Sequence, residues 1–248
     1  MTYSVRPIRL GTLSLEASTI TYMMNFGRKI ECPCVSWLVE GPWGQVIIDS
    51  GPPRADWSTK YHRPMTQTVE EQPENAFRRA GVDLDHVRWV ILSHLHWDHA
   101  YNNRLFPNAE FLVQESELRY AESPLPVHLR GYEVGMSGKP FYRVGALREV
   151  HGSFELFPGL QILHTPGHSP GSQVVLVGET GKRLLIAQDT IPSYANWRPD
   201  QDPFFIPNTI HVDLQDYYQS IKLIASLNAS VLPGHDEEVF TREHYLAN

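Results

Sequence analysis

The segment Ser93–Ala100 reads SHLHWDHA and places three histidines and one aspartate within six residues. Imidazole and carboxylate groups are common ligands of zinc and related divalent metals. The segment follows the apolar run Val87–Leu92 directly, and that run predicts a buried strand. Ligands at a strand end are held firmly and are still reachable by a substrate. The pattern therefore predicts a metal centre at the end of this strand.

The spacing within the segment indicates two metal positions. His94 and His96 are two residues apart, so their side chains lie on the same side of an extended chain. Asp98 and His99 are adjacent and point apart unless the chain turns, which assigns them to a different position. Three further candidates stand at predicted strand ends or directly after a Pro-Gly turn: His168, Asp189 and His235.

We therefore predict a centre of two divalent metal ions. The predicted ligands are His94, His96 and His168 for the first ion, Asp98, His99 and His235 for the second, and Asp189 as the bridge. This ligand set suits Zn²⁺ best, while Mn²⁺, Fe²⁺ and Co²⁺ also fit. A purely structural zinc site is the alternative, but such sites are normally closed by four ligands and often use cysteine. Seven ligands for two ions leave positions for water or substrate, which favours catalysis.

The elements that position these ligands occur twice in the same order: strand, turn, strand ending in aspartate, helix, strand and histidine. The predicted segments are 35–39, 45–51, 69–80 and 87–92 in the first half, and 173–177, 183–189, 214–227 and 229–232 in the second. Two such units predict two sheets packed face to face with helices outside them, a four-layer αββα sandwich. The ligand-bearing loops of both halves would then meet along one edge.

Composition limits the class of protein. A chain of 248 residues with 42% hydrophobic and 20% charged residues is typical of one globular domain, which we expect to span residues 1–248. The net charge of −7 argues against a nucleic-acid surface. No export signal and no apolar run of membrane-spanning length is evident, so we expect a cytoplasmic protein without a membrane partner. Cys32 and Cys34 are expected to be reduced core residues.

The combined motifs resemble those of the metallo-β-lactamase superfamily. The HxHxDH pattern at 94–99, the later ligands and the sequence Asp49-Ser50-Gly51 extend the resemblance over nearly the whole chain. The resemblance is strongest to the N-acyl-homoserine lactone lactonases, because of the compact size, the segment Val113–Ala121 and the fully His/Asp ligand set. It implies the αββα fold, two zinc ions, hydrolysis of a lactone and, in related enzymes, a homodimer.

One position departs from that family. The lactonases place a tyrosine three residues after the bridging aspartate, where it contacts the substrate carbonyl, but this chain has Pro192 there. Tyr194 is two residues further on, and we expect it to act as the catalytic tyrosine instead. The alternatives are that the substrate is handled differently and that Tyr194 is an ordinary packed aromatic residue of the loop.

The expected reaction is attack of a metal-bridging hydroxide on the carbonyl of a lactone, most of all an N-acyl-homoserine lactone. Asp98 or Asp189 would relay a proton to the leaving alkoxide. The alternatives are hydrolysis of another small cyclic ester, a cyclic amide or a thioester, then hydrolysis of a phosphodiester, and last a metal-binding protein without turnover.

Three segments are candidates for the walls of the substrate pocket. Thr21–Phe26 offers methionine and aromatic side chains, which suit an apolar pocket or an ordinary core. The segments 55–62 and 130–142 are expected to form loops over the site, with Trp57 and Tyr132 closing it.

Overall fold

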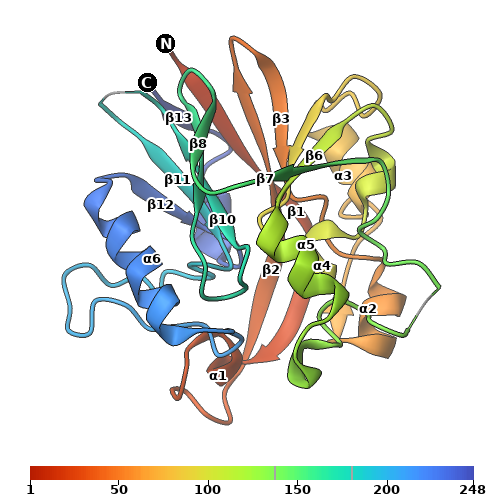
Figure 1. The fold of residues 1–248 in the computed structure, drawn as a ribbon, viewed down its shortest axis with the longest axis vertical. Coiled ribbons are helices and arrows are strands. Elements are labelled where there is room, and N and C mark those ends of the chain that lie inside the picture. Colours follow the sequence, from red (N-terminus) through yellow and green to blue (C-terminus); the bar gives the residue numbers. More distant parts are fainter. Residues whose placement is uncertain (137, 180) are drawn as a thin grey trace.

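The computed structural model describes residues 1–136, 138–179 and 181–248 (Figure 1). Ser137, in the predicted loop 130–142, and Thr180 lie outside the described residues.

Two β-sheets form the centre of the molecule. The larger sheet has eight strands among the described residues, in the order β13-β1-β2-β3-β5-β6-β7, with the short β4 paired to β1. Its strands are β1 (Tyr3–Glu16), β2 (Lys29–Gly41), β3 (Gly44–Ile48), β4 (Met65–Thr66), β5 (Trp89–Ile91), β6 (Glu110–Gln114), β7 (Ala146–Val150) and β13 (Tyr245–Ala247). The smaller sheet has the order β12-β11-β10-β9-β8. Its strands are β8 (Phe154–Phe157), β9 (Leu160–His164), β10 (Gln173–Val177), β11 (Leu184–Gln188) and β12 (Ser230–Pro233).

Helices cover the outer faces of both sheets (Figure 1). The α-helices are α1 (Ala17–Ile20), α2 (Ala55–Tyr61), α3 (Pro73–Arg79), α4 (Trp97–Ala100), α5 (Glu115–Glu122) and α6 (Leu214–Ser226). Short 3-10 turns are η1 (Asn103–Leu105), η2 (Pro126–His128) and η3 (Glu237–Thr241). The longest helix, α6, begins at Asp213, whose carboxylate accepts hydrogen bonds from the backbone N–H groups of Gln215 and Asp216 and so caps the first turn.

The apolar residues divide into three layers of core. Between the sheets, Trp37 and Ile91 of the larger sheet pack with Ile186 of the smaller one. Outside the smaller sheet, α6 buries Tyr217 and Ile221 at helical spacing against the strands. Another cluster covers the outer face of the larger sheet and includes side chains of α3 and α5. The predicted αββα sandwich is therefore confirmed.

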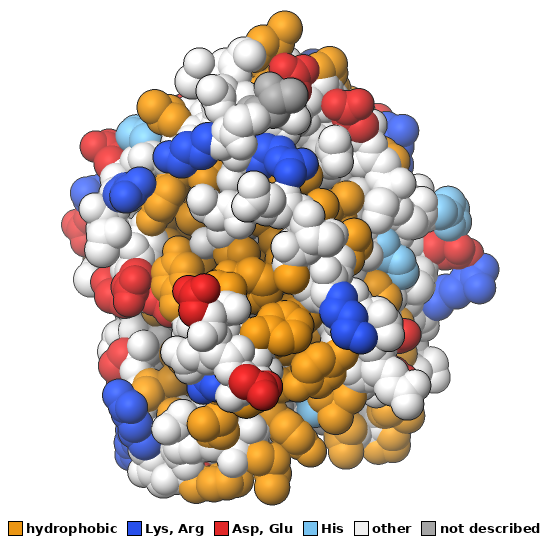
Figure 2. Space-filling model, turned by 90° about the vertical axis from the view of Figure 1, so that its left-hand side faces the viewer, with side chains coloured by type: hydrophobic (Ala, Val, Ile, Leu, Met, Phe, Trp, Pro, Cys, Tyr) orange, Lys and Arg blue, Asp and Glu red, His pale blue; other side chains and the backbone are white. Residues whose placement is uncertain are grey.

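One face of the molecule carries an apolar surface area. Figure 2 views the left-hand side of Figure 1, where α6 lies, and shows apolar side chains gathered over the middle of this face with acidic and basic groups dispersed around them. No helix among the described residues is long and apolar enough to cross a membrane.

The predicted repeat is visible in the strand pairing. β2 and β3 are antiparallel and β3 runs parallel to β5, while β10 and β11 are antiparallel and β11 runs parallel to β12. The backbone is left-handed at Asp49, directly after β3, with φ 64°, and at Gln188, the last residue of β11, with φ 44°. Such backbone strain in non-glycine residues clusters at functional sites, and both residues lie beside the candidate ligands.

The prediction for the helix at 69–80 is partly wrong, and the prediction for the two cysteines is confirmed. The helix predicted over 69–80 is shorter, since α3 begins at Pro73, a residue that favours the first turn of a helix. The preceding residues instead form a turn in which Glu71 accepts a 2.7 Å hydrogen bond from the backbone N–H of Thr68. Cys32 and Cys34 are buried free thiols in β2, as predicted, and burial raises the pKa of Cys32 to about 12.

Candidate metal centre

The structure brings all seven predicted ligands together at one edge of the two sheets. They come from the loops after β5, β9, β11 and β12. Their ligand atoms form two groups, each with all atoms within 4.8 Å of one another: His94, His96, His168 and Asp189 in the first, and Asp98, His99 and His235 in the second. His94, His96 and His168 lie together and Asp98, His99 and His235 lie together, while Asp189, the predicted bridge, groups with the first three.

In the first group, three imidazole nitrogens converge. His94 Nε2 lies 2.9 Å from His96 Nδ1, and His168 Nε2 lies 3.2 Å and 3.1 Å from these two atoms. Burial lowers the pKa of all three histidines, so their rings are neutral and retain a lone pair. Three nitrogen atoms that face one another in this way are arranged to share a cation.

The second group depends on the turn of α4. Because Asp98 and His99 lie in this one-turn helix, adjacent side chains reach the same site. Asp98 Oδ2 lies 3.8 Å from His99 Nε2 and 3.9 Å from His235 Nε2. The turn that the sequence required for these adjacent residues is present.

Asp189 connects the two groups. Its Oδ1 lies 3.2 Å from His99 Nε2 and 2.9 Å from His235 Nε2, while its Oδ2 lies 3.3 Å from His168 Nε2. Burial opposes ionisation of Asp189, but the surrounding histidines outweigh it and hold the pKa of this carboxyl well below its usual value. A carboxylate with one oxygen toward each group has the geometry of a bridging ligand.

The contacts also leave buried polar atoms unsatisfied. Within the described part of the chain, His99 Nε2 and Asp189 Oδ1 have no hydrogen-bond partner despite their close approach to other polar atoms. Unpaired buried polar atoms are costly, and a divalent cation between the groups would satisfy both. The donor set, the lowered pKa of the three histidines of the first group and these two atoms therefore fit a pair of metal ions.

Outer hydrogen bonds fix the orientation of the rings. Nδ1 of His99 lies 2.8 Å from a carboxylate oxygen of Asp49, and Nδ1 of His168 and of His235 lie 2.7 Å and 2.9 Å from the backbone carbonyl oxygens of Ile210 and Pro33. Because Nδ1 of each ring contacts a group outside the ligand cluster, Nε2 of each ring points toward the other candidate ligands. Such outer partners select the tautomer and raise the basicity of a metal ligand.

Asp49 is a residue of the site to which the sequence reasoning gave no role. It accepts hydrogen bonds from the backbone N–H and the hydroxyl of Ser93, both at 2.7 Å, and from the side-chain amide of Gln188 as well as facing His99. The motif Asp49-Ser50-Gly51 after a strand was visible in the sequence, but the three residues that contact Asp49 lie far away along the chain.

Glu117 is a second such residue. Its buried carboxylate accepts from Leu95 N at 2.9 Å, Tyr132 Oη at 3.0 Å and Ser169 Oγ at 2.6 Å, and also from Gly171 N. It therefore ties the loop of His94 and His96 to the loop of His168. Burial raises the pKa of Glu117, while these donors lower it.

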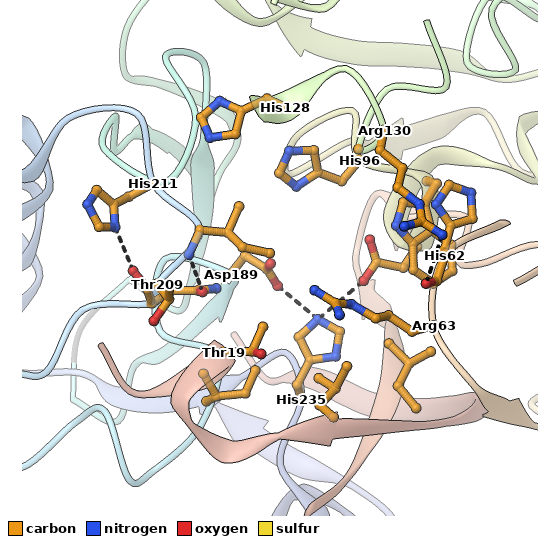
Figure 3. A pocket seen from close by; sticks show the side chains of 18 of the residues that line it. Thr19, His62, Arg63, His96, His128, Arg130, Asp189, Thr209, His211 and His235 are labelled. Atoms are coloured by element: carbon orange, nitrogen blue, oxygen red, sulfur yellow. Dashed lines mark hydrogen bonds and ion pairs between the residues drawn. The ribbon is translucent and has the colours of Figure 1, made fainter. Parts of the chain in front are cut away.

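A cavity of about 510 Å³ opens onto the two groups. Its lining includes His96, Asp98, Asp189 and His235 among the candidate ligands. Figure 3 shows His211 and Thr209 on one side and His62, Arg63 and Arg130 on the other. Apolar lining residues come from several elements: Leu13, Leu15, Ile20, Val127 and Ile210.

The predicted walls are only partly found. The segment 55–62, predicted as a loop, is wrong as a loop because Ala55–Tyr61 form α2. Its last residue His62 lines the cavity together with Arg130 of the second predicted loop, whereas the segment Thr21–Phe26 does not. The wall is instead formed by Thr19 and Ile20, and Met23 and Phe26 are 65% and 66% exposed, neither core nor lining.

Trp57 and Tyr132 do not line the cavity either. Both instead contact residues close to the cavity wall. Trp57 Nε1 donates a 2.7 Å hydrogen bond to Glu133 in the second loop, and the Tyr132 ring packs edge-on against His96 at 4.8 Å.

Tyr194 is not brought to the candidate ligands. Its hydroxyl donates a 3.1 Å hydrogen bond to the carbonyl oxygen of Val231, and its side chain lines a different cavity beside Arg242. The backbone N–H of Tyr194 donates to Asp236, which holds this residue in place. The placement agrees with the alternative reading, a packed aromatic residue.

Comparisons with known proteins agree with this geometry. The family model of the metallo-β-lactamase superfamily matches residues 30–235. The N-acyl homoserine lactonase AttM of Rhizobium radiobacter is 29% identical, with 94% of this chain and 93% of the relative covered. The N-acyl homoserine lactonase AiiA of Bacillus thuringiensis subsp. kurstaki is 26% identical, with 79% of each chain covered.

Solved structures show the same fold. A quorum-quenching N-acyl homoserine lactone lactonase superposes with a TM-score of 0.77 at 25% identity, covering 95% of this chain and 92% of the other. An N-acyl homoserine lactone hydrolase solved with the product N-hexanoyl-L-homoserine at its catalytic metal centre has a TM-score of 0.79 at 23% identity, with 96% and 95% covered. The resemblance stated from the motifs is confirmed: this chain belongs to the metallo-β-lactamase superfamily.

Proposed function

We propose that this protein is a metal-dependent hydrolase that opens a lactone ring, with N-acyl-homoserine lactones as the substrate class. The observation that carries the proposal is the pair of His/Asp groups connected by Asp189 at the bottom of the cavity. The names of the relatives supply the reaction, since both AttM and AiiA are called N-acyl homoserine lactonases.

In this proposal, His94, His96 and His168 would hold one divalent ion, Asp98, His99 and His235 would hold the other, and Asp189 would contribute to both. Zn²⁺ is the metal that these ligands suit best. When bound, such a pair supplies Lewis acidity, lowering the pKa of water from about 16 to about 7 and polarising the ester carbonyl.

The residues of the chain have separate tasks in the reaction. Asp98 is part of the cavity lining, with its side chain 14% exposed, so it can pass a proton to the ring oxygen as that oxygen leaves. The ester carbonyl of a bound substrate would lie next to Asp189, which lines the cavity. The apolar lining, with Ile20 and Val127 on it, holds the acyl chain and excludes water from the reacting bond.

The function is tested by hydrolysis of N-hexanoyl- and N-decanoyl-homoserine lactone beside simple γ- and δ-lactones, followed with a pH indicator. The protein is first stripped with a chelator and then reloaded with zinc. Ring opening by the zinc-loaded protein alone is the expected result. Asp189→Asn should abolish turnover, whereas the matched exposed variant Asp85→Asn should retain it.

A thioester, a cyclic amide and an aryl phosphodiester complete the panel. Faster cleavage of any of these than of every lactone would replace the proposed substrate class.

A further inference from the structure

The cavity contains polar side chains beyond the candidate metal ligands. These are Thr19, His62, Arg63, His128, Arg130, Asn208, Thr209 and His211. Several of them already have partners: His62 Nε2 contacts Glu133 Oε1 at 2.8 Å, the Arg130 guanidinium donates to the carbonyl oxygens of Tyr61 and His62, and Thr209 donates to Ser18. A side chain that donates a hydrogen bond to a substrate must therefore be one without a partner in the protein.

Arg63 is such a donor. Its guanidinium forms no hydrogen bond or ion pair with any residue that the structure describes, although it is a member of the cavity lining. In Figure 3 the Arg63 side chain extends from the wall toward the middle of the cavity, on the side of His235. The head group is therefore free to bind a ligand that enters above the candidate metal centre.

The backbone that carries Arg63 is anchored. Ser58 Oγ donates a 2.9 Å hydrogen bond to the carbonyl oxygen of Arg63, and Arg130 holds the carbonyl oxygens of the two preceding residues. The adjacent His62 stacks on Trp97, with ring centroids 4.2 Å apart and planes 6° from parallel. A fixed base with an unpaired head group reduces the entropy lost when a ligand is bound.

Charge defines what Arg63 would bind. The carboxylates that line the cavity are Asp98 and Asp189, and both are candidate metal ligands. With divalent ions bound, their charges are compensated, and the guanidinium, which stays charged in proteins, faces an electropositive site. A negatively charged oxygen placed between them would be stabilised by both.

Hydrolysis of a lactone creates such an oxygen. Water adds to the carbonyl carbon and gives one proton to Asp98, so the carbonyl oxygen becomes anionic in the transition state. The ring C–O bond then breaks and Asp98 passes that proton to the leaving oxygen. The carboxylic acid formed releases its own proton to water, so the product carries one negative charge as a carboxylate.

We propose that Arg63 is a further catalytic residue, which donates hydrogen bonds to the carbonyl oxygen as it becomes anionic and then to the product carboxylate. The proposal rests on the proposed function. This chain has Pro192 at the position of the lactonase tyrosine, and Tyr194 faces another cavity, so neither residue can donate to the carbonyl oxygen. Arg63 would supply that hydrogen-bond donor instead. Because the ground-state carbonyl is neutral, the contact strengthens during the reaction, which raises kcat more than it lowers KM.

The test compares Arg63→Gln and Arg63→Lys with the matched variant Arg54→Gln, which removes the same charge at an exposed position outside the cavity. All three are loaded with zinc and their metal content is measured. For N-hexanoyl-homoserine lactone, Arg63→Gln should lower kcat at least about tenfold with KM within about threefold. Arg63→Lys should recover part of the loss, and Arg54→Gln should match the unchanged protein.

A binding measurement gives an independent readout. The affinity of the zinc-loaded proteins for the product N-hexanoyl-homoserine and for its neutral primary amide is measured by calorimetry. Arg63→Gln should reduce the preference for the carboxylate over the amide about tenfold, with metal content unchanged. If Arg63 had only a structural role, its replacement would lower the affinity for the carboxylate and for the amide equally.

The outcomes separate the two proposals. If the protein opens no lactone but loses its carboxylate preference in Arg63→Gln, the proposed function is wrong and the anion-binding role of Arg63 stands, without the catalytic step. If lactones are opened and Arg63→Gln changes neither kcat nor this preference, the role of Arg63 is wrong and the proposed function stands. Equal loss of activity in Arg54→Gln would also overturn the role of Arg63.

Discussion

Nδ1 of His99 lies 2.8 Å from Oδ2 of Asp49, and both side chains are almost completely buried. The contact joins the end of β3 to the candidate metal ligands, and it orients the ring so that Nε2 faces Asp189. Burial lowers the pKa of His99, but Asp189, Asp98 and Asp49 outweigh it and raise that pKa well above its usual value. Asp49 therefore orients a candidate metal ligand without being one of the candidate ligands itself.

Substitution of Asp49 by asparagine tests this role. An amide in place of the carboxylate puts N–H groups against donors such as the Ser93 hydroxyl and leaves His99 without its carboxylate partner. We expect the affinity for the second metal ion to fall about 10- to 100-fold, measured by competition with a chromophoric chelator. Asp85→Asn serves as the control, and an unchanged affinity in Asp49→Asn would contradict the role.

The two metal groups should respond differently to pH. The pKa of His94, of His96 and of His168 is lowered by burial, so these ligands remain free of protons as the solution becomes mildly acidic. Burial lowers the pKa of His235 too, but Asp189 outweighs it and raises that pKa, as it does for His99. Protons therefore compete with metal at the second group. Lowering the pH from about 8 to about 6 should release one zinc equivalent before the other, measured as bound zinc after dialysis; simultaneous loss would contradict this assignment.

The metal-free protein should show the opposite dependence of stability on pH. A histidine whose pKa is raised by folding stabilises the protein below its unfolded pKa of about 6.5, and the contribution is lost as the pH rises through the folded value. His99 and His235 both belong to this class. We expect the free energy of unfolding of the metal-free protein, from urea denaturation, to fall between about pH 6.5 and the raised values. A rise over that range would show that the two histidines are neutral in the folded protein.

Glu117 should contribute to stability through its geometry. Replacement by glutamine keeps the size but turns an N–H group toward the donors Leu95, Ser169 or Gly171. An unsatisfied buried donor costs about 1 to 3 kcal/mol, and for a chain of this size that lowers Tm by roughly 2 to 4 °C per kcal/mol. Differential scanning calorimetry measures this change. A Tm equal to that of the unchanged protein would mean that the buried carboxyl is already protonated and donates a hydrogen bond itself.

Tyr194 should be dispensable for catalysis. Its hydroxyl is bonded to Val231 and faces the cavity beside Arg242, so Tyr194→Phe should leave kcat/KM for N-hexanoyl-homoserine lactone within about twofold. The loss of one hydrogen bond should lower the free energy of unfolding by about 1 kcal/mol. A loss of activity of tenfold or more would show that the loop rearranges when substrate binds.

The sequence predicted the layers of the fold and the grouping of the candidate ligands, because both depend on local signals. The spacing of apolar residues along the chain indicates which segments are strands and which are helices. A candidate ligand such as His168 follows a Pro-Gly pair directly, which predicts a turn at that position. The spacing of His94 and His96 also indicated that their side chains lie together, and their ring nitrogens are 2.9 Å apart.

The outer residues of the site were not predicted, because their partners are far away along the chain. Asp49 and His99 are separated by 50 positions, and Glu117 binds groups that precede and follow it by 22 and 54 positions. A single buried carboxylate leaves no periodic pattern in a sequence. The direction of Tyr194 likewise depends on how the loop after β11 packs against β12 and η3, which spacing alone does not specify.

The most direct test of the account is a titration of metal-free protein with zinc, with the rate of opening of N-hexanoyl-homoserine lactone measured at each step. The account predicts no ring opening without metal and full activity at two equivalents of zinc per chain, with Asp189→Asn inactive throughout. Full activity of the metal-free protein, or no ring opening of this or any other lactone at two equivalents, would contradict it.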